Sequence, residues 1–181
     1  MGLLYCRHDW ADRITPVYLA RFGVDLGGSV HEAALGSDNY RLMPGARRFD
    51  LGNHNYIGAA AAAESIDFLN EIGPKNIEMH VGNLTRQLAD GLLALDLPVV
   101  GSSSGDHLTS LVCVGKLGGS GHDSTDDTEM SSLSQHLNNN KVQHSIRKGL
   151  IRLSLHIYNT EEDITDVIAL ARGWRDTKVA A

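Results

Sequence analysis

Two apolar patterns in the middle of the chain predict consecutive helices. Apolar residues recur in steps of three and four at Ile77, Val81, Leu84, Leu88, Leu92 and Leu95. This spacing places them on one face of a long amphipathic helix. An alanine-rich segment from Ile57 onward predicts a helix before it. The pair Gly73-Pro74 marks the end of the first helix and the start of the second.

Short β-type segments follow these helices. "LPVV" and "HLTSLVCV" predict strands separated by the loop "GSSSGD". "KVQHSI" and "LIRLSLHI", joined through "RKG", predict a hairpin. Between the two pairs, the polar stretch 115–127 has almost nothing to bury and is expected to be a mobile surface loop. Residues 129–138 predict a further helix.

The second strand of the hairpin alternates between apolar and polar residues. Its apolar face comprises Ile151, Leu153, Leu155 and Ile157, and its polar face comprises Arg152, Ser154, His156 and Tyr158. The alternation leaves two interpretations of Arg152 open. It is either a solvated residue on the outer face of an edge strand, or a planar donor that binds a carboxylate through two hydrogen bonds.

A capped helix is expected directly after this strand. Thr160 or Asn159 provides the cap, and the acidic residues that follow at 161–163 place negative charge where the helix dipole favours it. Gly173 is expected to end the helix, because glycine is the usual residue just beyond a helix C-terminus.

The first fifty residues lack such periodicity. After the apolar run "GLLYC", the chain is rich in Gly, Asp and Asn and predicts an irregular extension of about forty residues. A self-contained domain rarely starts with such a segment. We therefore expect it to connect to a part of the protein that is missing.

Composition and charge exclude several classes of function. A net charge of −6 and a pI near 5.8 argue against a nucleic-acid surface, which normally needs a basic stripe. No apolar run is long enough to cross a bilayer, so a membrane protein is not expected. The N-terminus has no basic stretch followed by a long apolar core, so we expect no signal peptide and a cytoplasmic location.

The residues that most often bind metals or form disulfides are scattered. Cys6 and Cys113 lie far apart without metal-ligand spacing and are expected to be small buried hydrophobes. No two of the nine histidines stand at a spacing that aims both rings at one ion, so no metal site is expected. "GSSSG" matches the letters of a nucleophile elbow, but a predicted strand follows it where that motif needs a helix.

Four segments along the chain resemble one family. They are "GLLYCR", "RRFDLGNHNYIG", the long helix before "LDLPV", and "IRKGLIRLSLHIYNTEEDI". In these segments the chain resembles the C-terminal part of the class V aminotransferases. These are pyridoxal-phosphate (PLP) enzymes of fold type I, and they include isopenicillin-N-epimerase-like proteins and cysteine desulfurases. The last segment is the most specific.

The resemblance implies roles for three residues. Arg152 would bind the α-carboxylate of an amino-acid substrate. Asn53 occupies the position of a threonine that, in the family dimer, reaches the cofactor phosphate of the neighbouring subunit. An asparagine amide can still donate a hydrogen bond to a phosphate oxygen. His54 would lie near the same phosphate.

The resemblance also identifies groups that this chain lacks. In the family, the lysine that forms the Schiff base precedes the "GLLYCR"-like strand by about ten residues. None of Lys75, Lys116, Lys141, Lys148 and Lys178 matches that position. No catalytic residue is therefore assigned, and PLP is not expected to be bound covalently. The desulfurase cysteine before the arginine strand is also absent, which favours an aminotransferase or epimerase-like parent.

These expectations combine into one prediction. The fold is an α/β fold of the α+β type, with a small, mostly antiparallel sheet covered on one face by helices. Residues 1–52 are a residual edge of the large domain and a connecting segment, and residues 53–181 are the C-terminal small domain. The parent is a homodimeric PLP enzyme acting on an amino acid, inactive as the isolated chain. A non-catalytic dimerisation or binding domain, and one chain of a split enzyme, are the alternatives.

Overall fold

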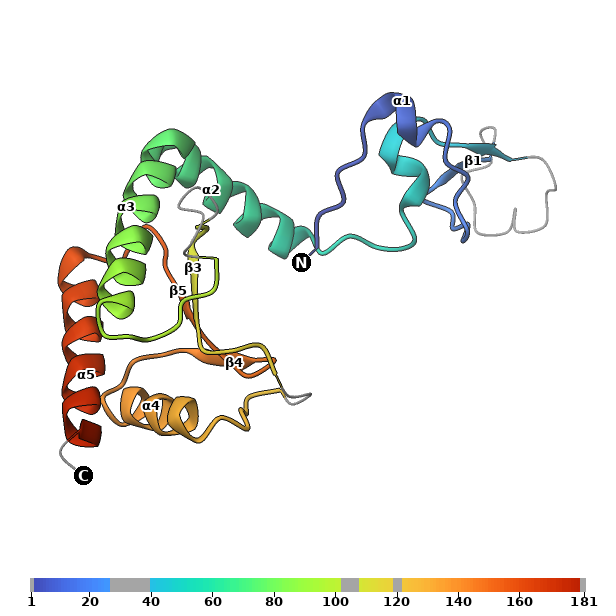
Figure 1. The fold of residues 1–181 in the computed structure, drawn as a ribbon. Helices are drawn as coiled ribbons and strands as arrows, with labels where there is room; N and C mark the ends of the chain where they lie inside the picture. The colour runs from blue at the N-terminus through green and yellow to red at the C-terminus, as the bar shows by residue number, and fades with distance from the viewer. Residues whose placement is uncertain (1, 27–39, 102–107, 119–121, 180–181) are drawn as a thin grey trace. The chain divides into compact units, whose positions relative to one another are not determined.

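The chain divides into two compact units. The computed structural model describes residues 2–26, 40–101, 108–118 and 122–179. Within it, the first unit is Met1–Leu69 and the second is Asn70–Ala181 (Figure 1). The division falls inside a helix, so the two units are described one at a time. The predicted domain boundary between residues 52 and 53 stays a prediction.

The first unit contains short elements besides the helix that leads out of it. They are helix α1 (His8–Ala11), strands β1 (Val24–Asp25) and β2 (Arg41–Leu42), and the 3₁₀ helix η2 (Gly45–Phe49). The two strands pair antiparallel. Most of the remaining described residues are irregular, as predicted. The apolar segment at residues 2–6 forms no regular element, because a strand needs a paired neighbour.

A buried arginine links α1 to η2. The Arg48 Nη2 donates to Asp12 Oδ1 at 2.5 Å, and its Nε donates to the Met43 carbonyl at 3.1 Å. The Gly45 backbone N–H donates to the same Asp12 oxygen at 3.1 Å. Because a buried charge is tolerated only when it is paired and hydrogen-bonded, this ion pair fixes the position of η2.

Helix α2 (Tyr56–Ile72) forms where the alanine-rich segment predicts it. It ends before Gly73, whose φ of +91° is in the left-handed region and breaks the helix. None of the residues of α2 is buried. Among the described residues, no helix has the length and apolar character needed to span a membrane.

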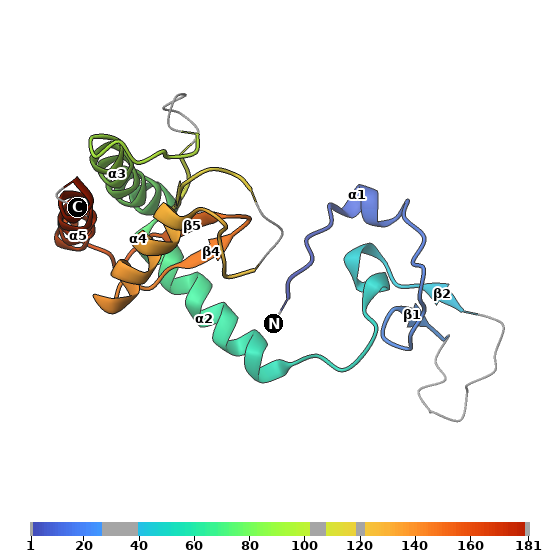
Figure 2. The same cartoon turned by 60° about the horizontal axis from the view of Figure 1, so that its bottom comes forward.

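The second unit is a three-stranded sheet with helices on one face. Its elements are α3 (Pro74–Leu93), β3 (Leu111–Val114), α4 (Thr128–Asn139), β4 (Ser145–Arg147), β5 (Leu150–Ser154) and α5 (Glu161–Val179). The strand order is β3-β5-β4, and both pairs are antiparallel (Figures 1 and 2). This architecture confirms the predicted fold class.

The core lies between this sheet and its helices. Three apolar residues of the predicted periodic helix, Leu84, Leu88 and Leu92, are at most 2% exposed. They pack in one cluster with the inward residues of β5, Ile151 and Leu153. The opposite face is mixed, because Arg147, Arg152 and Ser154 share it with Leu111, Cys113 and the buried Leu150.

The hairpin that contains β5 turns through two residues. Lys148 and Gly149 both have positive φ, at 51° and 82°, as the tight hairpin turn that matches strand twist requires. A Cβ at residue 149 would collide with the Gly118 carbonyl oxygen. The predicted hairpin is therefore confirmed, and glycine is needed at its second turn position.

All four predicted strands are shorter than expected. In the hairpin, "KVQHSI" is a strand only from Ser145, and "LIRLSLHI" only as far as Ser154. "LPVV" contributes only one bridge, between Val99 and Val114. "HLTSLVCV" forms a strand only from Leu111. The loop predicted at residues 101–106 lies almost wholly outside the described residues, as does part of the loop at 115–127.

The start of α5 agrees with its predicted cap. Thr160 Oγ1 accepts a hydrogen bond from the Asp163 N–H at 3.3 Å, and Asp163 Oδ2 accepts one from the Thr160 N–H at 2.8 Å. This reciprocal pair satisfies two donors at the helix N-terminus. The hydrogen bonds, first of all the one from the Thr160 backbone, lower the pKa of Asp163 below its ordinary value.

The predicted end of α5 at Gly173 is wrong, because the helix continues to Val179. Trp174, directly after this glycine, is 3% exposed, and its Nε1 donates to Ser132 Oγ at 3.1 Å. Burial of a tryptophan against α4 outweighs the low helix propensity of one glycine.

We predict that Gly149→Ala destabilises the protein by at least about 1–2 kcal/mol, the cost of a left-handed conformation for a residue with a Cβ. The collision with the Gly118 carbonyl adds to this cost. Urea unfolding at 25 °C measures the effect.

Gly173→Ala is the matched control, because a Cβ there meets nothing within 4 Å. It should stabilise the protein by about 0.5–1 kcal/mol, as alanine does in a helix interior. A destabilising Gly173→Ala would mean that the helix ends at this residue after all.

Candidate functional site

Arg152 lies on the central strand of the sheet and on the face away from the helices. Its backbone pairs with Cys113 of β3 on one side and with Ser145 of β4 on the other. The interpretation of Arg152 as a solvated residue on an edge strand is therefore wrong. The side chain is half-buried, which leaves the guanidinium between the protein and solvent.

The guanidinium lacks partners that its burial calls for. Its Nε is buried and has no hydrogen-bond partner. No acidic side chain of the described residues forms an ion pair with it. A buried donor without an acceptor costs about 1–3 kcal/mol, and more when the group is charged. Arg152 is thus prepared to gain free energy from an anion.

A second arginine on the same face, Arg147, differs from Arg152 because it already has partners. Arg147 of β4 forms an ion pair with Asp123, and its Nη1 also donates to the Ile146 carbonyl at 2.9 Å. The charge of Arg147 is therefore already compensated within the chain. Of these two arginines, only Arg152 is available to an external carboxylate.

Cys113 is the closest cross-strand neighbour of Arg152 that can ionise. Burial raises the pKa of its thiol above the ordinary value, and the positive charge of Arg152 partly offsets this effect. The thiol is therefore protonated at neutral pH. Its contribution to stability is complete below the unfolded-state pKa and decreases as the pH rises through the raised folded-state value. The prediction that both cysteines are buried is wrong, since Cys6 and Cys113 are each half-buried.

The two residues expected near a cofactor phosphate lie in the first unit. Asn53 and His54 are exposed and precede the first turn of α2. The His54 Nε2 lies 3.8 Å from Asp50 Oδ2, and its ring contacts those of Phe22 and Tyr56 edge-on. Arg152 belongs to the second unit, and the two units are described separately. The role of Asn53 and His54 at a cofactor phosphate therefore stays a prediction.

The lysines do not fit a Schiff-base site. Lys75, Lys116, Lys141, Lys148 and Lys178 are all exposed. A lysine that forms a Schiff base is normally desolvated or placed beside a cationic group, which lowers its pKa. Among the described residues, therefore, no lysine has the environment of a Schiff-base site.

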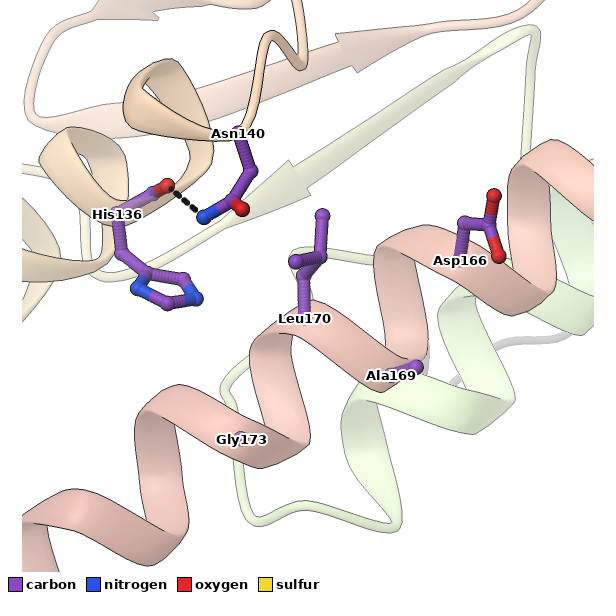
Figure 3. Close-up of a pocket in the computed structure, with 6 residues that line it drawn as sticks. All are labelled: His136, Asn140, Asp166, Ala169, Leu170 and Gly173. Atoms are coloured by element: carbon purple, nitrogen blue, oxygen red, sulfur yellow. Dashed lines mark hydrogen bonds between the residues drawn. The ribbon is translucent and has the colours of Figure 1, made fainter.

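Two surface hollows lie elsewhere in the second unit. The larger, of about 550 Å³, lies between the end of α4 and α5 and is lined by His136, Asn140, Asp166, Ala169, Leu170 and Gly173 (Figure 3). The second, of about 420 Å³, is lined in part by Leu153, Tyr158 and Asp163. Arg152 lines neither hollow. In the larger one, the Asn140 amide donates to the His136 carbonyl at 2.9 Å, so it caps the helix.

Comparison with known proteins establishes the family. The model of the family "Aminotransferase class-V" matches residues 1–167. The chain belongs to the class V aminotransferase family. The enzymes of this family depend on PLP. The resemblance carried by the four sequence segments is thus confirmed.

The relatives match this chain over only part of their own length. It is 27% identical over 168 residues to "Uncharacterized aminotransferase YcbU" of Bacillus subtilis, covering 93% of this chain and 40% of the relative. It is 26% identical to a "Probable cysteine desulfurase" of Pyrococcus abyssi, covering 91% and 40%. The chain therefore spans about 40% of the length of these relatives.

A solved structure agrees with this fold. The apo structure of cysteine desulfurase from Thermococcus onnurineus NA1 superposes with a TM-score of 0.74 and 19% sequence identity. The match covers 96% of this chain and 42% of the desulfurase chain. Similarity at this level of identity concerns the fold alone.

Sequence reasoning missed the adjacency of Cys113 and Arg152. The two residues are 39 positions apart and come together only through the pairing of β3 with β5. The alternation within each strand shows which residues share a face, but it does not show the register between distant strands. No local signal in the sequence indicates this contact.

We predict that Cys113 reacts with iodoacetamide at a higher pH midpoint in the folded chain than in urea, because burial raises the pKa of its thiol. The Cys6→Ser variant isolates the signal, and mass spectrometry measures the rate. Arg152→Met should raise the midpoint further, because it removes the charge that lowers the pKa. An unchanged midpoint would contradict the contact between the two side chains.

Proposed function

We propose that this chain provides the substrate-carboxylate site of a class V aminotransferase-like enzyme, and that Arg152 binds the α-carboxylate of an amino acid. The observation that supports this role is the buried Nε of Arg152, which has no hydrogen-bond partner and lies on the face of the sheet opposite the core. A planar guanidinium matches a carboxylate through two parallel hydrogen bonds. In a complete enzyme, such a contact orients the substrate relative to the cofactor.

The parent activity is PLP chemistry on an amino acid. The cofactor acts as an electron sink when it is bound. The residues of this chain contribute orientation and charge. A transaminase or epimerase-like reaction is favoured over desulfuration, because the segment just before the arginine strand, residues 144–149, contains no cysteine to act as the nucleophile. We propose that the isolated chain is inactive.

A second candidate function is association with another chain. Exposed apolar residues are abundant in the first unit, among them Leu3, Leu4, Tyr5, Val17 and Tyr18, which are 72–88% exposed. Helix α2 buries none of its residues. Apolar surface of this kind typically marks an interface. A second copy of this chain, as in a cytoplasmic homodimer, or a separate chain of a split enzyme would cover it. Light scattering that gives a strict monomer would count against the dimer.

We predict that L-alanine shifts the NMR signal of the Arg152 Nε–H in this chain. One charge-assisted carboxylate contact is worth about 1.5–3 kcal/mol, which corresponds to a Kd of roughly 10–100 mM. Titration at constant ionic strength measures it, and Arg152→Lys assigns the signal.

Two controls separate this contact from general salt effects. L-alanine methyl ester lacks the carboxylate and should leave the signal unchanged. Arg147→Lys should preserve binding, because Arg147 is already paired with Asp123. An equal response to alanine and to its ester would rule out Arg152 as the carboxylate site.

A further prediction concerns the cofactor. After incubation with PLP, borohydride reduction and dialysis, no single lysine should carry the cofactor stoichiometrically, because all five are exposed. Peptide mapping by mass spectrometry measures the label. Stoichiometric label on one lysine of the folded chain, absent from the urea-unfolded chain, would show a built Schiff-base site.

A further inference from the structure

Cys113 and Arg152 form the type of cross-strand pair in which side chains approach most closely. The Cys113 carbonyl accepts from the Val100 N–H at 2.9 Å, and the Gly115 N–H donates to the Pro98 carbonyl at 2.8 Å. These backbone groups of alternate residues therefore point away from β5. Cys113 and Arg152 are thus a non-hydrogen-bonded pair, with Cα atoms about 4.5 Å apart.

Ser145, on the other side of Arg152, is more distant by the same geometry. Because backbone groups alternate along a strand, those of Arg152 point toward β4 and form a hydrogen-bonded pair with Ser145. Cα atoms in such a pair are about 5.5 Å apart. Cys113 is therefore the neighbour whose chemistry acts most directly on the guanidinium.

The charge state of this neighbour decides whether Arg152 is available. On the same face, Asp123 occupies Arg147 and compensates its charge. A negative group at residue 113 would do the same to Arg152, within the reach of a cross-strand pair. The thiol found there is instead neutral at physiological pH, because the ordinary pKa of a thiol already lies above this pH and burial raises it further.

We propose that Cys113 keeps the carboxylate site accessible by placing a neutral group against Arg152. Any negative charge at residue 113 closes the site by pairing with the guanidinium. This inference rests on the proposed function of Arg152. It adds a role for a residue outside the four segments that carry the family resemblance.

The test compares Cys113→Asp with Cys113→Asn, two variants of the same shape that differ in charge. In the titration with L-alanine, Cys113→Asn should keep the Kd within about twofold of the parent chain. Cys113→Asp should weaken binding at least tenfold, and its Arg152 Nε–H signal should start near the alanine-bound position. Equal binding by the two variants would overturn the proposal.

The NMR signal of the Arg152 Nε–H, measured without any ligand, separates this inference from the proposed function. If the parent chain does not respond to L-alanine, the carboxylate role of Arg152 fails. The difference between the unliganded Cys113→Asp and Cys113→Asn signals then still tests whether residue 113 contacts the guanidinium. No difference between them would overturn the contact itself.

Alkylation after folding provides a second route if the aspartate variant fails to fold. In the Cys6→Ser chain, the Cys113 thiolate displaces iodide from iodoacetate and forms an S–CH₂ bond that carries a carboxylate. Iodoacetamide gives the neutral amide of the same size. The carboxylate adduct should lose the response to L-alanine and the amide adduct should retain it. Equal responses would contradict the proposal.

Discussion

The central strand β5 is the constraint on which the second unit depends. It is hydrogen-bonded on both sides, and its inward residues pack into the core beneath α3, α4 and α5. The same pairing holds Arg152 at the middle of the opposite face, where its Nε has no acceptor. The free energy gained by burying one face thus supports an unsatisfied charge on the other. Stability and the candidate site therefore share a single strand.

Local patterns in the sequence predict most elements of the fold. The spacing of apolar residues by three and four predicts α3, and the alternation of apolar and polar residues predicts the two faces of β5. The capping residue Thr160 predicts the start of α5. Each signal lies within one element, where neighbouring residues determine the structure. The central position of β5 is different, because it depends on pairing with β3 across the intervening loop and α4. The alternation within β5 does not show that β3 pairs with it.

The errors have identifiable physical causes. Gly173 resembles a helix end, but burial of Trp174 against Ser132 keeps the helix intact beyond it. "LPVV" has strand propensity, yet only Val99 finds a partner in β3. The candidate site shows the same difference between signals within one element and contacts between distant elements. A family motif and the alternation of its own strand indicate Arg152, whereas the pairing of two distant strands places Cys113 beside it.

The two-residue turn at Lys148 and Gly149 also fixes which face of β5 carries Arg152. Because side chains alternate along β5, a slip of one residue in its pairing would exchange its two faces. The guanidinium would then point into the apolar core, and a leucine or isoleucine would take its place on the other face. By holding β4 and β5 in one register, the turn therefore secures the core and the position of Arg152 together.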